Sequence, residues 1–219
     1  SPGMNAIVQE LKGLLKTKSI GTDSDRALLL DFQAALETQP EKAIKLEKDA
    51  LAQIENITAD NARLVSNLHA NLGGLYRMNG HPDLAREHME KSISLLDQFN
   101  LLHINDSIPQ IANYAMFLTE QQEPERGISE LQKLSGIIKE YHSDDCLDYA
   151  KVQETLGTIY LMPANLPQAK THFKRAFKIY EKIWADEPEM IEAKYQEIQE
   201  LYPQIGFCIG KNLSGLLTK

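Results

Sequence analysis

The sequence has little of what several common protein classes require. Only two cysteines, Cys146 and Cys208, occur in 219 residues, and they lack both the paired spacing of a zinc site and the density of a disulfide framework. Aromatic residues make up 7% of the chain, and no clear run of alternating β-branched residues is present, which disfavours a β-sheet fold. No stretch approaches the ~18 consecutive apolar residues of a membrane-spanning helix. We therefore expect a helical, cytoplasmic protein without a membrane partner.

Basic residues are also fewer than acidic ones. Lysine and arginine total 23 against 31 aspartate and glutamate residues, which gives a net charge of -8. Because this excess of negative charge repels a phosphate backbone, we expect no nucleic-acid partner. One group of basic residues is nevertheless spaced so that it forms a stripe along a helix. We expect this stripe to be a solvated surface rather than a contact with nucleic acid or an acidic partner. The stripe consists of Lys170, Lys174, Arg175, Lys178 and Lys182.

What the sequence does have is an internal repeat. Residues 70–76, Ala-Asn-Leu-Gly-Gly-Leu-Tyr, align with residues 112–118 at a shift of 42, and the same shift carries the register to residues 155–160. Within each unit, small and apolar residues recur at helical spacing on one face, which predicts two helices per unit. Small positions on one helix allow the large side chains of the other to approach closely. Each unit is therefore expected to form an antiparallel helical hairpin.

Two slots of this repeat define the expected contact between the helices of a hairpin. We call them the glycine slot, which holds Gly73 and Gly157 on the first helix, and the large apolar slot, which holds Met89 and Phe173 on the second. The first unit departs from both, because Asp31 stands in its glycine slot and Glu47 in its large apolar slot. The repeat therefore does not predict how the first unit packs.

Helix-stopping residues separate the two helices of each unit. In Asn79-Gly80-His81-Pro82, a helix stop and a flexible residue precede a proline suited to the first turn of the next helix. Pro40 and Pro124 occupy the same slot as Pro82. In the unit near residue 150, the proline moves one position along to Pro167, so we expect a loop of different geometry within an intact hairpin.

These residues resemble the tetratricopeptide repeat family, whose pattern is matched best by Leu156, Gly157, Tyr160, Ala169, Phe173 and Ala176. The family's usual unit has about 34 residues, and the longer period here resembles kinesin-light-chain repeats. The resemblance implies an all-α fold, a right-handed α-solenoid of antiparallel helical hairpins with about 10–11 helices. We expect a cloning remnant at 1–3 and one repeat domain at 4–219, with repeats near 24–57, 66–98, 108–141 and 150–184 and capping helices at 187–217.

The resemblance also implies where a partner binds, since the first helices of such an array line its concave groove. Asn71 and Asn113 share one groove-facing slot, and an asparagine amide both donates and accepts hydrogen bonds, as the backbone of an extended peptide requires. The alternative is that each asparagine bonds within its own hairpin. The expected groove residues are Asn67, Asn71, Arg77, Asn113, Thr119, Lys151, Glu154 and Thr158.

No pattern of catalytic, cofactor or metal-binding residues accompanies the repeat. The six histidines lack the spacing of a zinc site, and His88 and His172 lie two whole periods apart, which indicates a repeated structural slot. We expect a non-catalytic scaffold that binds a protein or extended peptide, without catalytic residues, metal or cofactor. Two alternatives stay open: a peptide-sensing regulatory domain, and a homo-oligomer formed through the apolar segment 205–210 of a terminal hairpin.

Overall fold

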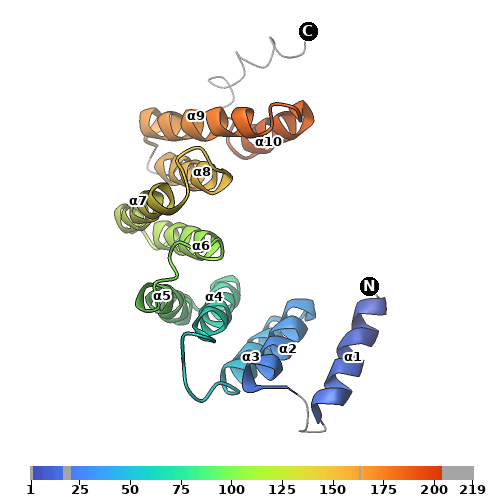
Figure 1. The fold of residues 1–219 in the computed structure, drawn as a ribbon. Helices are drawn as coiled ribbons and strands as arrows, with labels where there is room; N and C mark the ends of the chain where they lie inside the picture. The colour runs from blue at the N-terminus through green and yellow to red at the C-terminus, as the bar shows by residue number, and fades with distance from the viewer. Residues whose placement is uncertain (1, 17–20, 163, 204–219) are drawn as a thin grey trace. The chain divides into compact units, whose positions relative to one another are not determined.

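The structure is a computed structural model that describes residues 2–16, 21–162 and 164–203, and every regular element in these ranges is a helix (Figure 1). This confirms the expected all-α class. None of the described helices is both long enough and apolar enough to cross a membrane. The helices are α1 (Pro2–Lys16), α2 (Asp23–Leu36), α3 (Pro40–Leu51), α4 (Ala62–Met78), α5 (Pro82–Gln98), α6 (Ser107–Glu120), α7 (Pro124–Tyr141), α8 (Leu147–Leu161), α9 (Leu166–Ile183) and α10 (Pro188–Leu201).

The chain divides into two compact units, Ser1–Tyr114 and Ala115–Lys219, with the boundary inside α6. In unit 1, α2 packs against α3 and α4 packs against α5, while α3 also contacts α4. In unit 2, α8 packs against α9 and contacts α7. Each unit is thus built from packed helical hairpins, as the repeat predicts. One domain spanning residues 4–219 stays a prediction.

The glycine slot is a point of close approach within two hairpins. A Cβ atom added to Gly73 would lie 2.6 Å from Cγ of Met89, and one added to Gly157 would lie 2.7 Å from the ring of Phe173. Both distances are shorter than van der Waals contact, so a glycine is needed for α4 to meet α5 and for α8 to meet α9 at this spacing. Met89 and Phe173 are buried in their hairpins.

Three hairpin loops turn the chain in the same way. Gly80, Gln122 and Ala164 share one repeat slot, and all have a positive φ, of 76°, 65° and 59° respectively. The residue after each donates its N–H to a carbonyl oxygen five positions earlier, at 2.8–2.9 Å, a helix-ending pattern of the Schellman type. Ala164 therefore makes the same left-handed turn as Gly80 and Gln122, against the expectation of a different geometry in the loop before α9. This loop differs at the start of the next helix, where Pro167 is the second residue instead of the first and the side chain of Asn165 accepts a hydrogen bond from the N–H of Gln168.

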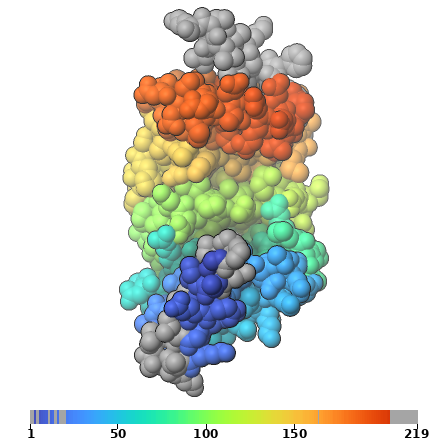
Figure 2. Space-filling view, turned by 90° about the vertical axis from the view of Figure 1, so that its right-hand side faces the viewer, coloured from blue at the N-terminus to red at the C-terminus, as the bar shows by residue number. Residues whose placement is uncertain are grey.

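The end of the described chain packs on the α8/α9 hairpin. Helix α10 lies beside α9 in both views (Figures 1 and 2) and ends at Leu201, two residues before Pro203. The ring of Tyr202 lies 6.1 Å from that of Phe173, measured between centroids. The segment 205–210, which we considered for self-assembly, lies outside the described residues together with Cys208, and that hypothesis stays a prediction.

Candidate partner-binding surface

A small pocket lies in unit 1 between α4 and the first part of α6, residues 107–114. Its volume is about 210 Å³. It contains two of the residues expected to bind a partner, Arg77 and Asn113, together with small residues of α4 and buried residues of α5. The full lining is Ala70, Gly74, Arg77, Met78, Met89, Ser92, Gln110 and Asn113.

Gln110 forms one wall of this pocket and is held by hydrogen bonds from two helices. Its Oε1 accepts from Oγ of Ser66 at 2.9 Å and from Oγ of Ser92 at 2.6 Å, and both serines are buried. Its Nε2 donates to Oδ1 of Asn67 at 2.5 Å. With its oxygen and its amide group both bonded, the side chain has little freedom to turn.

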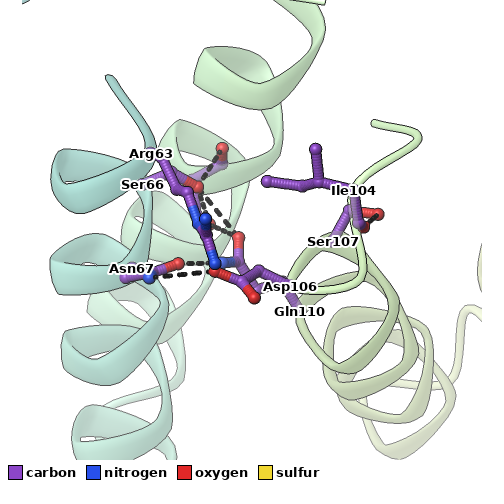
Figure 3. A network of polar contacts seen from close by, with 8 residues as sticks. Arg63, Ser66, Asn67, Ile104, Asp106, Ser107 and Gln110 are labelled. Atoms are coloured by element: carbon purple, nitrogen blue, oxygen red, sulfur yellow. Dashed lines mark hydrogen bonds and ion pairs between the residues drawn. The ribbon is translucent and has the colours of Figure 1, made fainter. Parts of the chain in front are cut away.

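Asn67 continues the network toward the start of α6. Its Nδ2 points at Oδ2 of Asp106 at 3.5 Å, and the same oxygen accepts from Nε of Arg63 at 2.6 Å (Figure 3). The start of α6 is fixed beside it by Ser107, whose hydroxyl donates to the carbonyl oxygens of Leu102 and Ile104. Asn67, which we expected to contact a partner, therefore takes part in the joint between α4 and α6.

The network could have been noticed in the repeat register, although we did not predict it. Ser66 shares its slot with Ala150, and Gln110 shares its slot with Leu68 and Val152, all of which are buried. Polar residues in slots that otherwise hold buried apolar ones need hydrogen-bond partners. Such departures from the repeat are thus a usable signal for a buried polar joint.

The two asparagines of the shared slot have different surroundings. Asn113 is exposed and lines the pocket, and its side chain makes no hydrogen bond to any residue in the described part of the chain. Nδ2 of Asn71, also exposed, donates to Oδ1 of Asp31 at 2.8 Å and to Oε1 of Glu47 at 3.2 Å. Asn71 is therefore bonded within the chain, but not within its own hairpin as the alternative had it, because Asp31 and Glu47 belong to the preceding hairpin.

Glu47 is the acid that departs from the large apolar slot, and it is only 2% exposed. Burial first, and then the neighbouring carboxylate of Asp31, raise the pKa of Glu47 from 4.5 to about 9. One carboxyl oxygen, Oε1, accepts from Asn71, whereas Oε2 is buried without a partner among the described residues. Near neutral pH, Glu47 is therefore a buried, protonated acid.

The groove residues expected in unit 2 bind mainly to their own unit. Oε2 of Glu154 accepts from the hydroxyl of Tyr180 at 2.7 Å, and its Oε1 accepts from Nζ of Lys194 at 3.1 Å. Burial and the carboxylate of Glu154 together raise the pKa of Tyr180, which keeps the phenol protonated. Thr158 donates to the carbonyl oxygen of Glu154 at 3.1 Å within α8, whereas the side chain of Glu154 links α8 to α9 and α10.

Lys151 and Thr119 complete the expected set. Lys151 is exposed and lies 3.9 Å from a carboxylate oxygen of Asp148, a contact that is screened by solvent. Thr119 is only 4% exposed, and its hydroxyl donates to the carbonyl oxygen of Ala115 at 2.9 Å. The expectation that Thr119 faces a groove was wrong, because the hydroxyl satisfies its own helix backbone.

His88 and His172 occupy structural positions. His88 stacks on Tyr76 with 5.4 Å between ring centroids, and His172 stacks in the same way on Tyr160 at 5.3 Å. This confirms the interpretation of His88 and His172 as one repeated slot. Nδ1 of His69 lies 2.8 Å from Nδ1 of His88. Among the described residues, no group of three or more histidine, cysteine or acidic side chains is placed to hold a metal ion.

Comparison with known proteins supports the repeat. Residues 107–182 match a family model described as the tetratricopeptide repeat. No curated protein matches the chain. Helix content and hairpin packing agree with this family model, which covers parts of both units.

Several solved structures share the fold. The crystal structure of BtubC (BKLC) from P. vanneervenii is 17% identical with a TM-score of 0.75, and the match covers 100% of this chain and 91% of that one. A putative kinesin light chain with nearly identical TPR-like repeats from Podosopora anserina is 14% identical with a TM-score of 0.68, covering 83% and 89%. MamA is 15% identical with a TM-score of 0.57, covering 82% and 90%. At these identities the likeness establishes the fold.

Proposed function

We propose that this chain, which carries tetratricopeptide repeats, is a non-catalytic module that holds an extended peptide or protein segment on the α4–α6 face of unit 1. Proteins with such repeats generally act as scaffolds for protein interaction. The observation that carries the proposal is the pocket beside Asn113, whose exposed amide has no hydrogen-bond partner among the described residues. An amide in this position is able to donate to and accept from the backbone of a bound segment.

The size of the pocket favours a side chain over a small-molecule ligand. Its volume of about 210 Å³ lies below the ~300–1,000 Å³ of small-molecule sites. Ala70, Gly74 and Met89 give it apolar walls, which suit an apolar side chain of the bound segment. Arg77 and Asn113 line the same pocket and supply polar groups.

The hydrogen-bond network around Gln110 also favours binding. Gln110 and Ser92 line the pocket and are already hydrogen-bonded to each other, and Gln110 is bonded to Asn67 as well. A wall that is held before the partner arrives loses little conformational entropy on binding. Asn67 therefore acts in this proposal as a residue that positions the pocket.

Filling the pocket tests the proposal. A Cβ added to Gly74 meets no atom within 4 Å, so Gly74→Leu is expected to fit without strain and to occupy the pocket. Peptides selected by display on the native chain are expected to bind this variant at least about tenfold more weakly, measured by fluorescence anisotropy. The matched control is Gly136→Leu, because Gly136 in α7 also has open space around an added Cβ.

Two alanine variants separate binding from stability at the shared slot. Asn113→Ala is expected to weaken peptide binding and leave the urea midpoint unchanged, whereas Asn71→Ala is expected to lower the midpoint because it removes the donor to Asp31 and Glu47. Selected peptides that bind native chain and Gly74→Leu with equal affinity would place the binding surface elsewhere. Equal loss in Gly136→Leu would mean that the effect is not specific to the pocket.

A further inference from the structure

A second cavity, of about 620 Å³, lies in unit 2 between the end of α7, the loop before α8, and α9. Its charged lining comprises four basic residues and two acidic ones. Since the whole chain carries a net charge of -8, a cavity with an excess of positive charge is a local exception. Its volume lies within the ~300–1,000 Å³ range typical of ligand sites.

The two acids of this cavity are each paired with one base. Oδ2 of Asp144 lies 2.9 Å from Nζ of Lys139, and Asp145 forms an ion pair with Lys182. The other two bases, Arg175 and Lys178, form no ion pair with any residue in ranges 21–162 and 164–203. Both are exposed on α9, three positions apart, and so lie on the same side of the helix.

A neutral side chain holds Arg175 at the cavity wall. Its Nη1 donates to Oε1 of Gln153 at 3.4 Å, a long contact with an uncharged acceptor that leaves the charge uncompensated. Gln153 is 2% exposed and is fixed by Oγ of Ser135 at 3.1 Å and by Nδ1 of His172 at 2.9 Å. Burial first, and then the positive charge of Arg175, lower the pKa of His172. The charge of Arg175 is therefore felt by the neighbouring imidazole.

We propose that this cavity is a docking site for an acidic segment of a partner protein, with a carboxylate of that segment held between Arg175 and Lys178, in place of the solvated surface that we expected for these two residues of the basic stripe. The guanidinium of Arg175 offers paired donors that match a carboxylate, and Lys178 adds a point charge on the same side of the helix. Lys139 and Lys182 become available to further carboxylates when these displace Asp144 and Asp145. The site is separate from the α4–α6 pocket, because all of its residues belong to α7, the loop before α8, α8 and α9.

Charge reversal with a matched control tests this site. The probe is a fluorescein-labelled peptide of ten glutamates, with a ten-glutamine peptide as the uncharged comparison, in low-salt buffer. The native chain is expected to bind only the glutamate peptide, and Arg175→Glu with Lys178→Glu is expected to weaken that binding at least about tenfold. The control, Lys170→Glu with Lys174→Glu, changes the same charge on the same helix outside the cavity and is expected to alter affinity less than about threefold.

Removing Asp144 and Asp145, which compete with the bound segment for the lysines, gives a second test. A purely structural role of these residues would not predict its expected result. Asp144→Asn with Asp145→Asn frees Lys139 and Lys182 and is expected to tighten binding of the glutamate peptide. Helicity by circular dichroism checks each variant, and Arg175→Gln with Lys178→Gln replaces the reversal if that variant does not fold. The proposal is overturned by absent binding to the native chain, by equal loss in the control, by unchanged or weaker binding after removal of the acids, or by tighter, Arg175-dependent binding of a ten-nucleotide oligothymidylate.

Discussion

The α2/α3 hairpin and the α8/α9 hairpin fill the same two repeat slots with opposite chemistry. In α8/α9, Gly157 meets the buried ring of Phe173, and the contact is apolar and close. In α2/α3, the corresponding positions are Asp31 and Glu47, and the joint is completed by Asn71 of the next hairpin. The repeat thus determines where two helices meet, while the residues in the slots decide whether the joint is packed or hydrogen-bonded.

The acids in the slots of α2/α3 affect both the stability of this hairpin and its contact with the next one. A buried carboxyl with one oxygen unpartnered among the described residues lowers stability, because its lost hydration is only partly replaced. In return, Asn71 links α4 to both helices of the preceding hairpin, which a contact within one hairpin does not achieve. The acid pair therefore couples two hairpins of unit 1 through a titratable group.

The largest effect is expected when the acid that occupies the large apolar slot of α2/α3 is placed in the same slot of α8/α9. Phe173→Glu removes a fully buried ring and leaves a carboxyl without the asparagine donor that Glu47 has. We expect unit 2 to lose at least about 3–5 kcal/mol of unfolding free energy, measured by urea denaturation followed by circular dichroism. Phe173→Met is the control, because Met89 fills the same slot in α4/α5, and a similar loss in both variants would contradict the interpretation.

The converse exchange places the apolar pair in the first hairpin. Asp31→Ala with Glu47→Met removes the unsatisfied acid, and alanine is chosen because Ala115 occupies the glycine slot in α6. We expect the unfolding free energy to rise by about 1–3 kcal/mol, the penalty of a buried group that lacks a partner. The single variant Glu47→Met, which leaves Asp31 beside an apolar side chain, is expected to gain less. A loss of stability in the double variant would mean that the hydrogen bonds to Asn71 outweigh the burial penalty.

The sequence predicts the hairpins well because their packing depends on residue size at repeated positions. Gly73 and Gly157, with their large neighbours Met89 and Phe173, repeat at a fixed spacing, and both members of each pair lie within one hairpin. The loop before α9 shows where this reasoning fails. Moving the proline to Pro167 suggested another turn, yet Ala164 adopts the left-handed conformation of Gly80, because the helix-ending hydrogen bonds, and not the proline, determine the turn.

The candidate site is less predictable because its polar partners come from different repeats. The sequence places Asn71 and Asn113 in one slot, but it does not tell that Asn71 is bonded and that Asn113 is exposed beside a pocket. The difference comes from the residue in the large apolar slot of the preceding hairpin. For Asn71 this residue is Glu47, which accepts its hydrogen bond, whereas for Asn113 it is Met89, which lines the pocket and offers no hydrogen bond. A residue's role at such a slot therefore follows from its neighbours across the hairpin boundary.

A pH dependence also separates the two kinds of helix contact. Burial, with the carboxylate of Asp31, raises the pKa of Glu47 to about 9 from 4.5, so between these values the folded state binds more protons than the unfolded state. The stabilising contribution of this proton is therefore complete below pH 4.5 and is lost as the pH rises toward 9. The slope is at most about 1.4 kcal/mol per pH unit.

The His69–His88 pair acts in the opposite direction and sets the window of measurement. Burial first, and then the charge of His88, lower the pKa of His69 from 6.5 to about 4, so below pH 6.5 the unfolded state binds the extra proton and stability rises with pH. The two slopes oppose each other at acid pH, but only that of Glu47 remains above pH 6.5. Urea unfolding between pH 6.5 and 8.5 is expected to show stability falling with pH in the native chain, and a flatter profile after Asp31→Ala with Glu47→Met. Equal slopes in the two proteins would mean that Glu47 is ionised in the folded state.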